Sequence, residues 1–391
     1  MLAKLKQFFA PEQKRSAAAP VIALHTAGRA VWTPRNYAAL AREGFAGNPV
    51  GYRCIRMIAE AAASIPWLAF VSEKDVSEHS ALRLLARPNP GQPGREFFEM
   101  LYGFLLVAGN AYVEKVETGG ELRELFALRP DRMKAIASAN GWPEAFEYSV
   151  NGQSVKFPRE SILHIRLFNP LNDHYGMSPL EAAQRSIDTH NAASAWNKAM
   201  LDNSARPSGA LVYGAADGHL TTDQFERLKR ELETSYQGAS NAGRPMVLEG
   251  GLDWKEMGYS PQEMQFIEAK NAAAREIALA FGVPPMLLGI PGDNTFANYA
   301  EANRSFWRQT VVPLAGRMAE ALTGFLAADF GDLRLSHDLD QVEALAGDRE
   351  ALWSRVERAS FLTNDEKRAA VGYGDEVVNE LPSPLAGEGG A

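Results

Sequence analysis

The chain has 391 residues, and at roughly 150 residues per domain we expect two or three domains. Its 46% hydrophobic and 23% charged content is typical of a globular protein with enough apolar material for a core. A formal charge of −8 argues against tight, non-specific nucleic-acid binding, and the single cysteine, Cys54, excludes an internal disulfide or a cysteine-based metal cluster and fits a reducing compartment such as the cytoplasm.

The two ends of the chain have the composition of loosely ordered segments. Residues 1–25 are rich in Ala, Lys and Pro, and residues 379–391 end in LPSPLAGEGGA. The opening MLAKLKQFFA lacks the long apolar core of an export signal. No apolar run approaches the roughly 20 residues that cross a bilayer, so we expect neither export nor membrane insertion.

The first half predicts helices followed by short strands. Asn48-Pro49 supplies a cap and a first-turn proline for a helix that ends before Pro66. PWLAFV then predicts a strand, and HSALRLLA and REFFEMLYGFLLVA predict two helices, the second closed by Gly109.

From Ala111 the apolar period shortens. AYVEKVE, LRELFAL, RMKAIAS, FEYSVNGQSVKF and ILHIRL predict strands, with a hairpin at Asn151-Gly152. This half is therefore expected to be α+β with a mainly antiparallel sheet.

The second half predicts two long helices around a small α/β module. Each helix has a serine cap, a proline at the first position and a glutamate at the third, in Ser178-Pro179-x-Glu181 and Ser260-Pro261-x-Glu263. The helices are expected to end near Asn203 and Phe281. Between them we expect a strand in SGALVY, an amphipathic helix in TTDQFERLKRELETSYQG with Phe225, Leu228, Leu232 and Tyr236 on one face, and a hairpin in PMVLEGGLDW.

A loop rich in Gly, Pro and Asn follows the second long helix, in LGIPGDNT. Asn298 and Glu301 then cap a helix that runs to about Phe330 with apolar residues every three or four positions. Pro313 lies in its middle and is expected to kink it. LRLSHDL predicts a strand, and GDREALWSRVERASFLTNDEKRAAVGYG predicts the last helices.

No catalytic or metal site follows from the sequence. There is no GxxxxGK[ST], HExxH or GxSxG, and the Gly-rich loop has no basic residue before Arg304 to cradle a phosphate. We interpret Cys54 as a buried small residue, His164 as one face of a strand, and His190 as an interface or solvated residue. Two acidic clusters could be acid/base pairs, although solvated acidic faces are commoner: Asp338, Asp340 and Glu343, and Asp348 and Glu350.

An ordered series of short motifs resembles the portal proteins of tailed bacteriophages, in the Hong Kong ninety-seven-like branch that also occurs in prophages and gene transfer agents. The series spans roughly residues 45–375. It comprises ALRLLARPNPGQPGREFFEMLYGFLLVAGNAYVEKV, ELFALRPDRM, HIR with GMSPLEAA, ARPSGAL, NAGRPMVLEGGLDW, AREIALAFGVPPMLLG, NTFANYAEA and FLTNDEKR. Asn364 stands where the family often has Pro, and the C-terminal part is short.

The resemblance implies a portal fold with named regions. These are a disordered arm (1–25), an α/β wing (26–178), a first stem helix (179–205), a small α/β clip (206–260), a second stem helix (261–282), a tunnel loop (283–297), a long kinked helix and return strand to the wing (298–344), a short helical crown (345–378) and a disordered tail (379–391).

The resemblance also implies roles for particular residues. The tunnel loop would approach DNA through Pro291, Gly292, Asp293, Asn294, Thr295 and Phe296. Channel-lining candidates are Glu263, Glu268, Lys270, Arg275 and Glu276, and clip candidates for partner binding are Arg227, Lys229, Arg230 and Arg244. For the clip helix, a solvated face with i,i+4 charge pairs is the commoner alternative. Residues 261–300 carry four acidic against two basic side chains, a balance that would let a duplex slide without being trapped by phosphate pairing.

The implied function is a ring of about twelve copies at one capsid vertex, through which DNA is packaged and ejected. The implied partners are double-stranded DNA, the large terminase subunit, a head–tail adaptor and the major capsid protein, with no membrane, cofactor, metal or catalysis. The location would be the virion, after assembly in the cytoplasm of a bacterial host. The alternatives are another head–tail structural protein, or a hydrolase with a dispersed carboxylate site.

Overall fold

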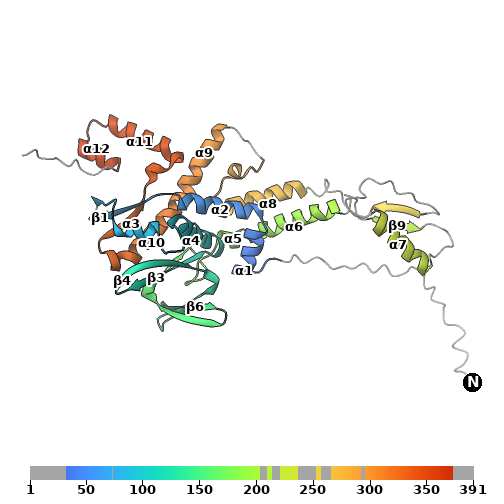
Figure 1. Cartoon of the computed structure of the whole chain (residues 1–391). Coiled ribbons are helices and arrows are strands. Elements are labelled where there is room, and N and C mark those ends of the chain that lie inside the picture. Colours follow the sequence, from blue (N-terminus) through green and yellow to red (C-terminus); the bar gives the residue numbers. More distant parts are fainter. Residues whose placement is uncertain are drawn as a thin grey trace, which may run out of the picture. The chain divides into compact units, whose positions relative to one another are not determined.

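The computed structural model describes residues 32–72, 74–202, 209–213, 221–236, 252–256, 266–291 and 296–372 (Figure 1). Its helices are α1 (Tyr37–Leu40), α2 (Pro49–Ala63), α3 (Ser80–Ala86), α4 (Gly94–Ala108), α5 (Pro179–Ala182), α6 (Gln184–Asp202), α7 (Thr222–Tyr236), α8 (Phe266–Ala280), α9 (Phe296–Phe306), α10 (Val312–Phe330), α11 (Ala346–Arg358) and α12 (Asn364–Ala370). Its strands are β1 (Trp67–Val71), β2 (Lys74–Asp75), β3 (Asn110–Thr118), β4 (Glu121–Leu128), β5 (Met133–Ala137), β6 (Pro143–Val150), β7 (Gln153–Pro158), β8 (Ile162–Arg166), β9 (Gly209–Tyr213), β10 (Leu252–Glu256) and β11 (Leu333–His337).

The predicted α+β class is confirmed, and the strand pairs are antiparallel. The described strands form sheets in the orders β4-β3-β8, β5-β6-β7, β11-β1-β2 and β10-β9. The β6–β7 hairpin turns at Asn151-Gly152, as predicted, with φ of 51° and 79°. In the small module, β10 pairs with β9, and helix α7 lies between these two strands in the sequence. The other half of the hairpin predicted in PMVLEGGLDW lies outside the described residues.

The main core forms where α2, α4 and α10 pack together. Fully buried side chains from these helices include Ile58, Leu101 and Met318. The continuous helical run Asn298–Phe330 is long and apolar enough to cross a membrane by length and composition, which the sequence interpretation had missed. Its apolar side chains enter this core, at Phe306, Val311, Ala315, Met318, Leu322 and Leu326, so the run is a core helix here.

The kink at Pro313 stays a prediction, and the helical run holds another feature just before this residue. A π-helical segment, Trp307–Val311, separates α9 from α10. Pro313 follows it as the second residue of α10, where its missing amide costs no hydrogen bond within that helix. The irregularity in this continuous run is therefore a local widening of the backbone turn just before the proline.

Two buried histidines predict how stability depends on pH. Burial lowers the pKa of His164 to about 3, with further contributions from Arg166 and His174, and lowers that of His337 to about 4. The His337 ring lies 4.0 Å from that of Trp67. Because both values lie below that of an unfolded histidine, the unfolded chain binds more protons as the pH falls from about 6.5 towards 4, and the folded state loses stability in that window.

Each histidine is expected to contribute a slope of about 1.4 kcal/mol per pH unit there. His337→Phe should remove one such slope while leaving the apolar contact with Trp67. Urea unfolding between pH 4 and 7 measures it. An unchanged slope in His337→Phe would contradict the assignment, whatever the offset in stability.

Candidate functional site

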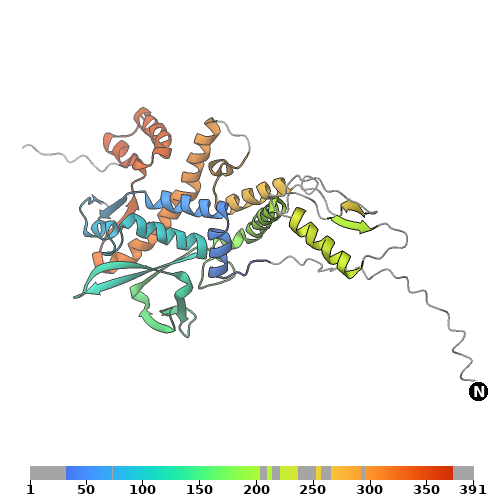
Figure 2. The ribbon, with the colours of Figure 1, turned by 45° about the vertical axis from the view of Figure 1, so that its right-hand side comes forward.

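The two predicted long helices lie against each other in the structure. α6 and α8 pack side by side, as both ribbon views show (Figures 1 and 2). Ile187 of α6 and Ile277 of α8 are buried, and the Ser186 hydroxyl donates a hydrogen bond of 2.6 Å to Glu276 Oε2. The first helix is divided after Ala182 into α5 and α6, and ends at Asp202. The predicted start of the second helix lies outside the described residues.

Polar contacts at the start of α2 fix α6 to the core. The Asn48 side-chain amide lies 3.2 Å from His190 Nδ1 and donates to Asn191 Oδ1 at 2.9 Å. Asn191 in turn donates to the backbone oxygen of Glu43 at 3.0 Å. His190 is only 4% exposed, so its interpretation as an interface or solvated residue was wrong. Burial, with a smaller contribution from the Lys270 charge, lowers its pKa and keeps Nδ1 available as an acceptor.

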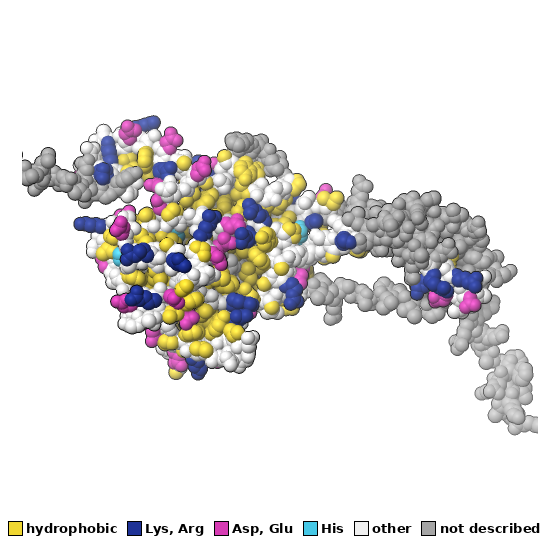
Figure 3. Space-filling view, viewed as in Figure 1, with side chains coloured by type: hydrophobic (Ala, Val, Ile, Leu, Met, Phe, Trp, Pro, Cys, Tyr) yellow, Lys and Arg dark blue, Asp and Glu magenta, His cyan; other side chains and the backbone are white. Residues whose placement is uncertain are grey.

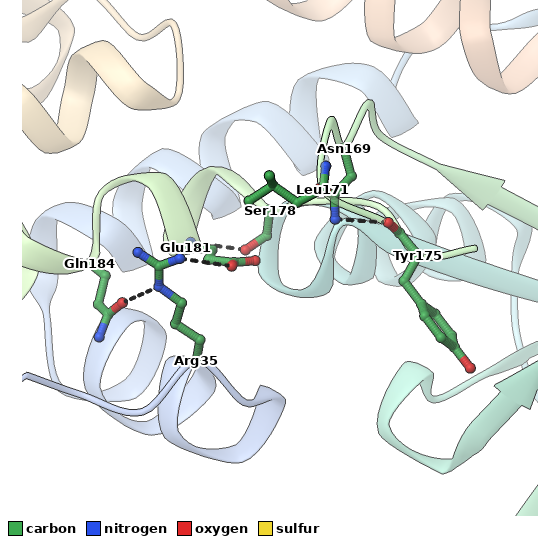
Figure 4. Close-up of polar contacts among 7 residues, drawn as sticks. All are labelled: Arg35, Asn169, Leu171, Tyr175, Ser178, Glu181 and Gln184. Atoms are coloured by element: carbon green, nitrogen blue, oxygen red, sulfur yellow. Dashed lines mark hydrogen bonds and ion pairs between the residues drawn. The ribbon is translucent and has the colours of Figure 1, made fainter. Parts of the chain in front are cut away.

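The segment before α1 is also tied to the first long helix. Thr33 donates its amide and its hydroxyl to the Asp188 carboxylate, at 2.8 and 2.5 Å. Arg35 reaches Gln184 Oε1 at 3.3 Å and the Glu181 carboxylate at 3.8 Å (Figure 4). The predicted cap of this helix is confirmed, because Ser178 Oγ accepts the Glu181 amide at 3.0 Å. The start of the first long helix is thus held from two sides.

The channel-lining candidates on α8 have different environments. Glu268, Arg275 and Glu276 are exposed, whereas Lys270 is half-buried towards His190. Arg275 donates to the backbone oxygen of Pro291 at 2.5 Å, so this cation is engaged with the start of the following loop. Glu263 lies outside the described residues. The exposed face of α8 therefore presents two carboxylates and one arginine.

The loop after α8 begins as folded structure. Val283 and Ile290 are buried, a 3-10 turn spans Pro285–Leu288, and Thr310 Oγ1 donates to the Gly282 oxygen at 2.6 Å. Of the six predicted loop residues, Pro291 is exposed and Phe296 begins α9. Gly292, Asp293, Asn294 and Thr295 lie outside the described residues. The part of the loop that precedes Pro291 is therefore packed against the core.

The basic candidates on α7 share that helix with acidic side chains. Arg227, Lys229 and Arg230 are exposed, next to the exposed Asp223 and Glu226, and Figure 3 shows both charges together there. Phe225 is 55% exposed and Leu228 half-buried. Arg244, and the side chains of Leu232 and Tyr236, lie outside what the structure describes. The described part of α7 is thus a mixed-charge surface.

Asp340 and Asp348, one from each acidic cluster, line the same cavity together with Arg308 and Arg349. Asp348 pairs with Arg304 and Arg308, and Asp340 pairs with Arg349. Within the described ranges no group of three or more His, Cys, Asp or Glu side chains could hold a metal ion. Cys54 is buried, and burial raises the pKa of its thiol to about 12, which keeps it from acting as a nucleophile. These carboxylates therefore act as partners of arginines.

One ordered surface loop was missed by the sequence interpretation. It connects β8 to α5, and asparagine side chains hold its backbone (Figure 4). Asn169 Oδ1 accepts the Leu171 amide at 2.9 Å, its amide donates to the Tyr175 oxygen at 2.9 Å, and Asn172 Oδ1 accepts the His174 and Tyr175 amides. Phe168 and Leu171 are nevertheless 80% and 83% exposed. The signal was the asparagine spacing in FNPLND, which predicts side-chain-supported turns.

The sequence also matches a known protein family and several known proteins. The sequence family described as "Phage portal protein" matches residues 49–372. The portal protein of Enterobacteria phage HK97 is 25% identical over 84% of this chain and 76% of its own. An uncharacterized protein of Rickettsia bellii is 40% identical over 84% of this chain and 88% of its own.

Several solved structures are similar to this chain. A chain in the neck of an empty gene transfer agent (GTA) particle, computed with C6 symmetry, is 54% identical, with a TM-score of 0.71 over 89% of this chain and 96% of that one. A chain in the neck of the native GTA particle, computed with C12 symmetry, is 53% identical, with a TM-score of 0.68 and the same coverage. An HK97 family phage portal protein from Corynebacterium diphtheriae, 18% identical with a TM-score of 0.59 over 81% of this chain and 99% of that one, shares the fold.

Proposed function

Because the chain belongs to the phage portal protein family and to its HK97-like branch, we propose that it forms the portal ring of a phage or GTA particle. The observation that carries this is the match to chains of GTA necks at 53–54% identity over 89% of the residues. The C12 symmetry of one neck supports a ring of twelve copies. A closed ring requires two different, complementary surfaces on each copy.

The regions of a portal subunit can be laid onto the described elements. We propose that residues 26–178 and 298–344 form the wing, with the core of α2, α4 and α10 inside it. α5, α6 and α8 form the stem, β9, α7 and β10 belong to the clip, and α11 and α12 form the crown. The tunnel loop lies within 283–297. Since Val283–Ile290 packs on the core, the residues of this loop that approach DNA begin at Pro291.

The ring then acts as a passage. We propose that double-stranded DNA is driven through it by the terminase, that a head–tail adaptor later binds the clip at Arg227, Lys229, Arg230 and Arg244, and that the wing contacts the major capsid protein. The protein would assemble in the cytoplasm of its bacterial host and end at the capsid vertex. In this function the chain supplies shape and surface charge, and the motor is a separate protein.

Negative-stain electron microscopy with native mass spectrometry tests the ring directly. We expect rings with a central hole and a mass near twelve chains, each of 42.7 kDa. A chain that stays monomeric over a range of salt and protein concentrations would contradict self-assembly into a channel.

Charge reversal on α8 tests the passage of DNA. Glu268→Lys with Glu276→Lys would add positive charge to every copy, and we expect at least a tenfold loss of nuclease-protected DNA per particle, because repeated lysine–phosphate pairs slow a sliding duplex. Duplex binding by purified rings should become tighter and more salt-dependent. The matched control is Glu144→Lys with Glu160→Lys, two exposed carboxylates of the wing. Equal packaging by the stem variant and the wing variant would contradict a channel-facing α8.

A further inference from the structure

The loop that connects β8 to α5 presents two apolar side chains on a fixed backbone. Exposed apolar residues are common on protein surfaces, but Phe168 and Leu171 lie in a loop whose turns are held by Asn169 and Asn172. Its far end is held as well, because Asn110 Oδ1 accepts the Gly176 amide at 2.8 Å. A rigid loop loses little conformational entropy when its exposed side chains are covered. We call Phe168 and Leu171 the loop knob.

A groove of suitable size lies at the C-terminal end of α2. Two cavities, of about 510 and 240 Å³, adjoin there and share Ser64, Ile65 and Pro66. Apolar lining comes from Trp307 and Val342 in the larger one and from Leu85 and Phe98 in the smaller one. Both volumes exceed the about 150 Å³ of an enclosed cavity that holds benzene, and the side chains of Leu85, Phe98 and Val342 form buried walls of these open depressions. We call these residues the α2 groove.

The knob and the groove lie at opposite ends of one helix. Gly94, the first residue of α4, lines the groove. Gly109, directly after the last residue of α4, touches Gly176 at the far end of the loop. Fifteen helical residues separate these ends by roughly 22 Å. The two surfaces therefore cannot meet within one copy, whereas a contact between copies would be head-to-tail, the type that closes into a ring.

Each of the two surfaces has one acidic and one basic side chain near it. Asp173 and Arg317 line the same cavity as Phe168, and Arg95 and Glu343 line the α2 groove. In the part of the chain that the structure describes, none of these four side chains forms an ion pair. Each surface thus offers one charge of each sign at its rim, where pairs contribute register and specificity.

We propose that the loop knob of one copy inserts into the α2 groove of the next copy around the ring. The proposal rests on the proposed portal function and names the surfaces that such a ring would use in its wing. It assigns a role to Phe168 and Leu171, which are 80% and 83% exposed in the single chain. The occupant of the groove is a second copy of the same protein.

Cysteine cross-linking tests this pairing. Leu171→Cys and Ser64→Cys place thiols on the knob and the groove, both at exposed positions, while the native Cys54 is buried. In the double variant, mild oxidation should give a ladder of covalent multimers up to the full ring. A mixture of the two single variants should stop at dimers, since each copy then carries one partner. The matched control, Val155→Cys with Ser64→Cys, uses an exposed residue of β7 and should give no ladder.

The outcomes separate this inference from the proposed function. Rings in the microscope without cross-links in the Leu171→Cys/Ser64→Cys variant would overturn the knob-and-groove contact and leave the portal function standing. Covalent dimers from Leu171→Cys alone would mean that two loops meet each other, which also overturns it. Absence of both rings and cross-links would count against the portal function itself.

A second test measures ring formation without cross-linking. Phe168→Ser with Leu171→Ser should leave the melting temperature of the chain nearly unchanged, because both side chains are exposed. It should raise the protein concentration at which rings form by at least about tenfold, the effect of leaving one buried apolar side chain out of an interface. Rings that form at the original concentration would contradict the contact.

Discussion

Gly109→Ala is expected to lower the free energy of unfolding by about 3–5 kcal/mol, the sum of a left-handed backbone cost and a steric clash. Gly109 has a φ of 71°, and a Cβ there would lie 2.6 Å from the carbonyl carbons of Gly176 and Met177. These are backbone atoms, which cannot turn away as a flexible side chain would. The Gly109 carbonyl also accepts the Leu167 amide at 2.8 Å, so any shift would disturb both ends of the loop that leads to α5. Urea denaturation of purified protein measures the change.

Two other glycines separate the left-handed backbone cost from the steric clash. Gly119 has a similar φ of 67° with open space around its Cβ position, so Gly119→Ala should cost only about 1 kcal/mol. Gly103, inside α4, also has open space, and Gly103→Ala should stabilise the protein by up to about 1 kcal/mol through helix propensity. If Gly109→Ala proved no more harmful than Gly119→Ala, close packing between Gly109 and Gly176 would be ruled out as the cause.

Asn48→Ala should destabilise the protein by about 3 kcal/mol, because a helix cap and a buried bridge are lost together. Asn48 Oδ1 accepts the amides of Val50 and Gly51 at 3.0 and 2.9 Å. Its side-chain amide contacts His190 Nδ1 and donates to Asn191. The residue is 1% exposed, so water cannot replace these bonds. Since the bridge fixes α6 to the core, ring formation should also weaken, as measured by native mass spectrometry.

Asn48→Asp distinguishes the cap from the bridge. A carboxylate still accepts both amides, but it cannot donate to His190 or Asn191. At pH 8 the variant should therefore recover only part of the stability lost in Asn48→Ala. Lowering the pH towards 6 should reduce the difference in free energy of unfolding between the variant and the natural protein. The reason is that the introduced carboxylate favours a protonated His190 and raises its pKa. A gap that widens on acidification would contradict a direct contact between these two positions.

Elements that depend on local rules could be predicted from the sequence. The predicted caps at Asn48 and Ser178 lie at helix starts, and Gly109 ends α4 in the left-handed conformation. These outcomes depend on neighbouring residues alone. The cap predicted at Asn298 was wrong, because α9 already begins at Phe296. The pairing of β1 with β11 joins residues such as Trp67 and His337, and no periodicity within either strand indicates that partner.

The site residues also divide into those that local sequence patterns could place and those that depend on distant partners. The helices that carry Glu268, Glu276 and Arg227 could be placed from their apolar periods, because these patterns are local. The burial of His190 could not, because its partner Asn48 lies 142 positions away. The loop with Phe168 and Leu171 was missed because its order comes from asparagine hydrogen bonds, which leave no periodic apolar signal. The roles proposed for the residues on α8, α7 and the tunnel loop remain predictions for the experiments above.

The π-helical segment Trp307–Val311 has a consequence for how related chains can differ in length. A π turn holds about one residue more than an α turn, so the segment amounts to a single inserted residue within a continuous helix. Removing one residue there would convert the π turn into an ordinary α turn and leave α9 and α10 close to their present rotational register. Portal relatives that are one residue shorter at this point would therefore keep both the same core and the same exposed face of α9.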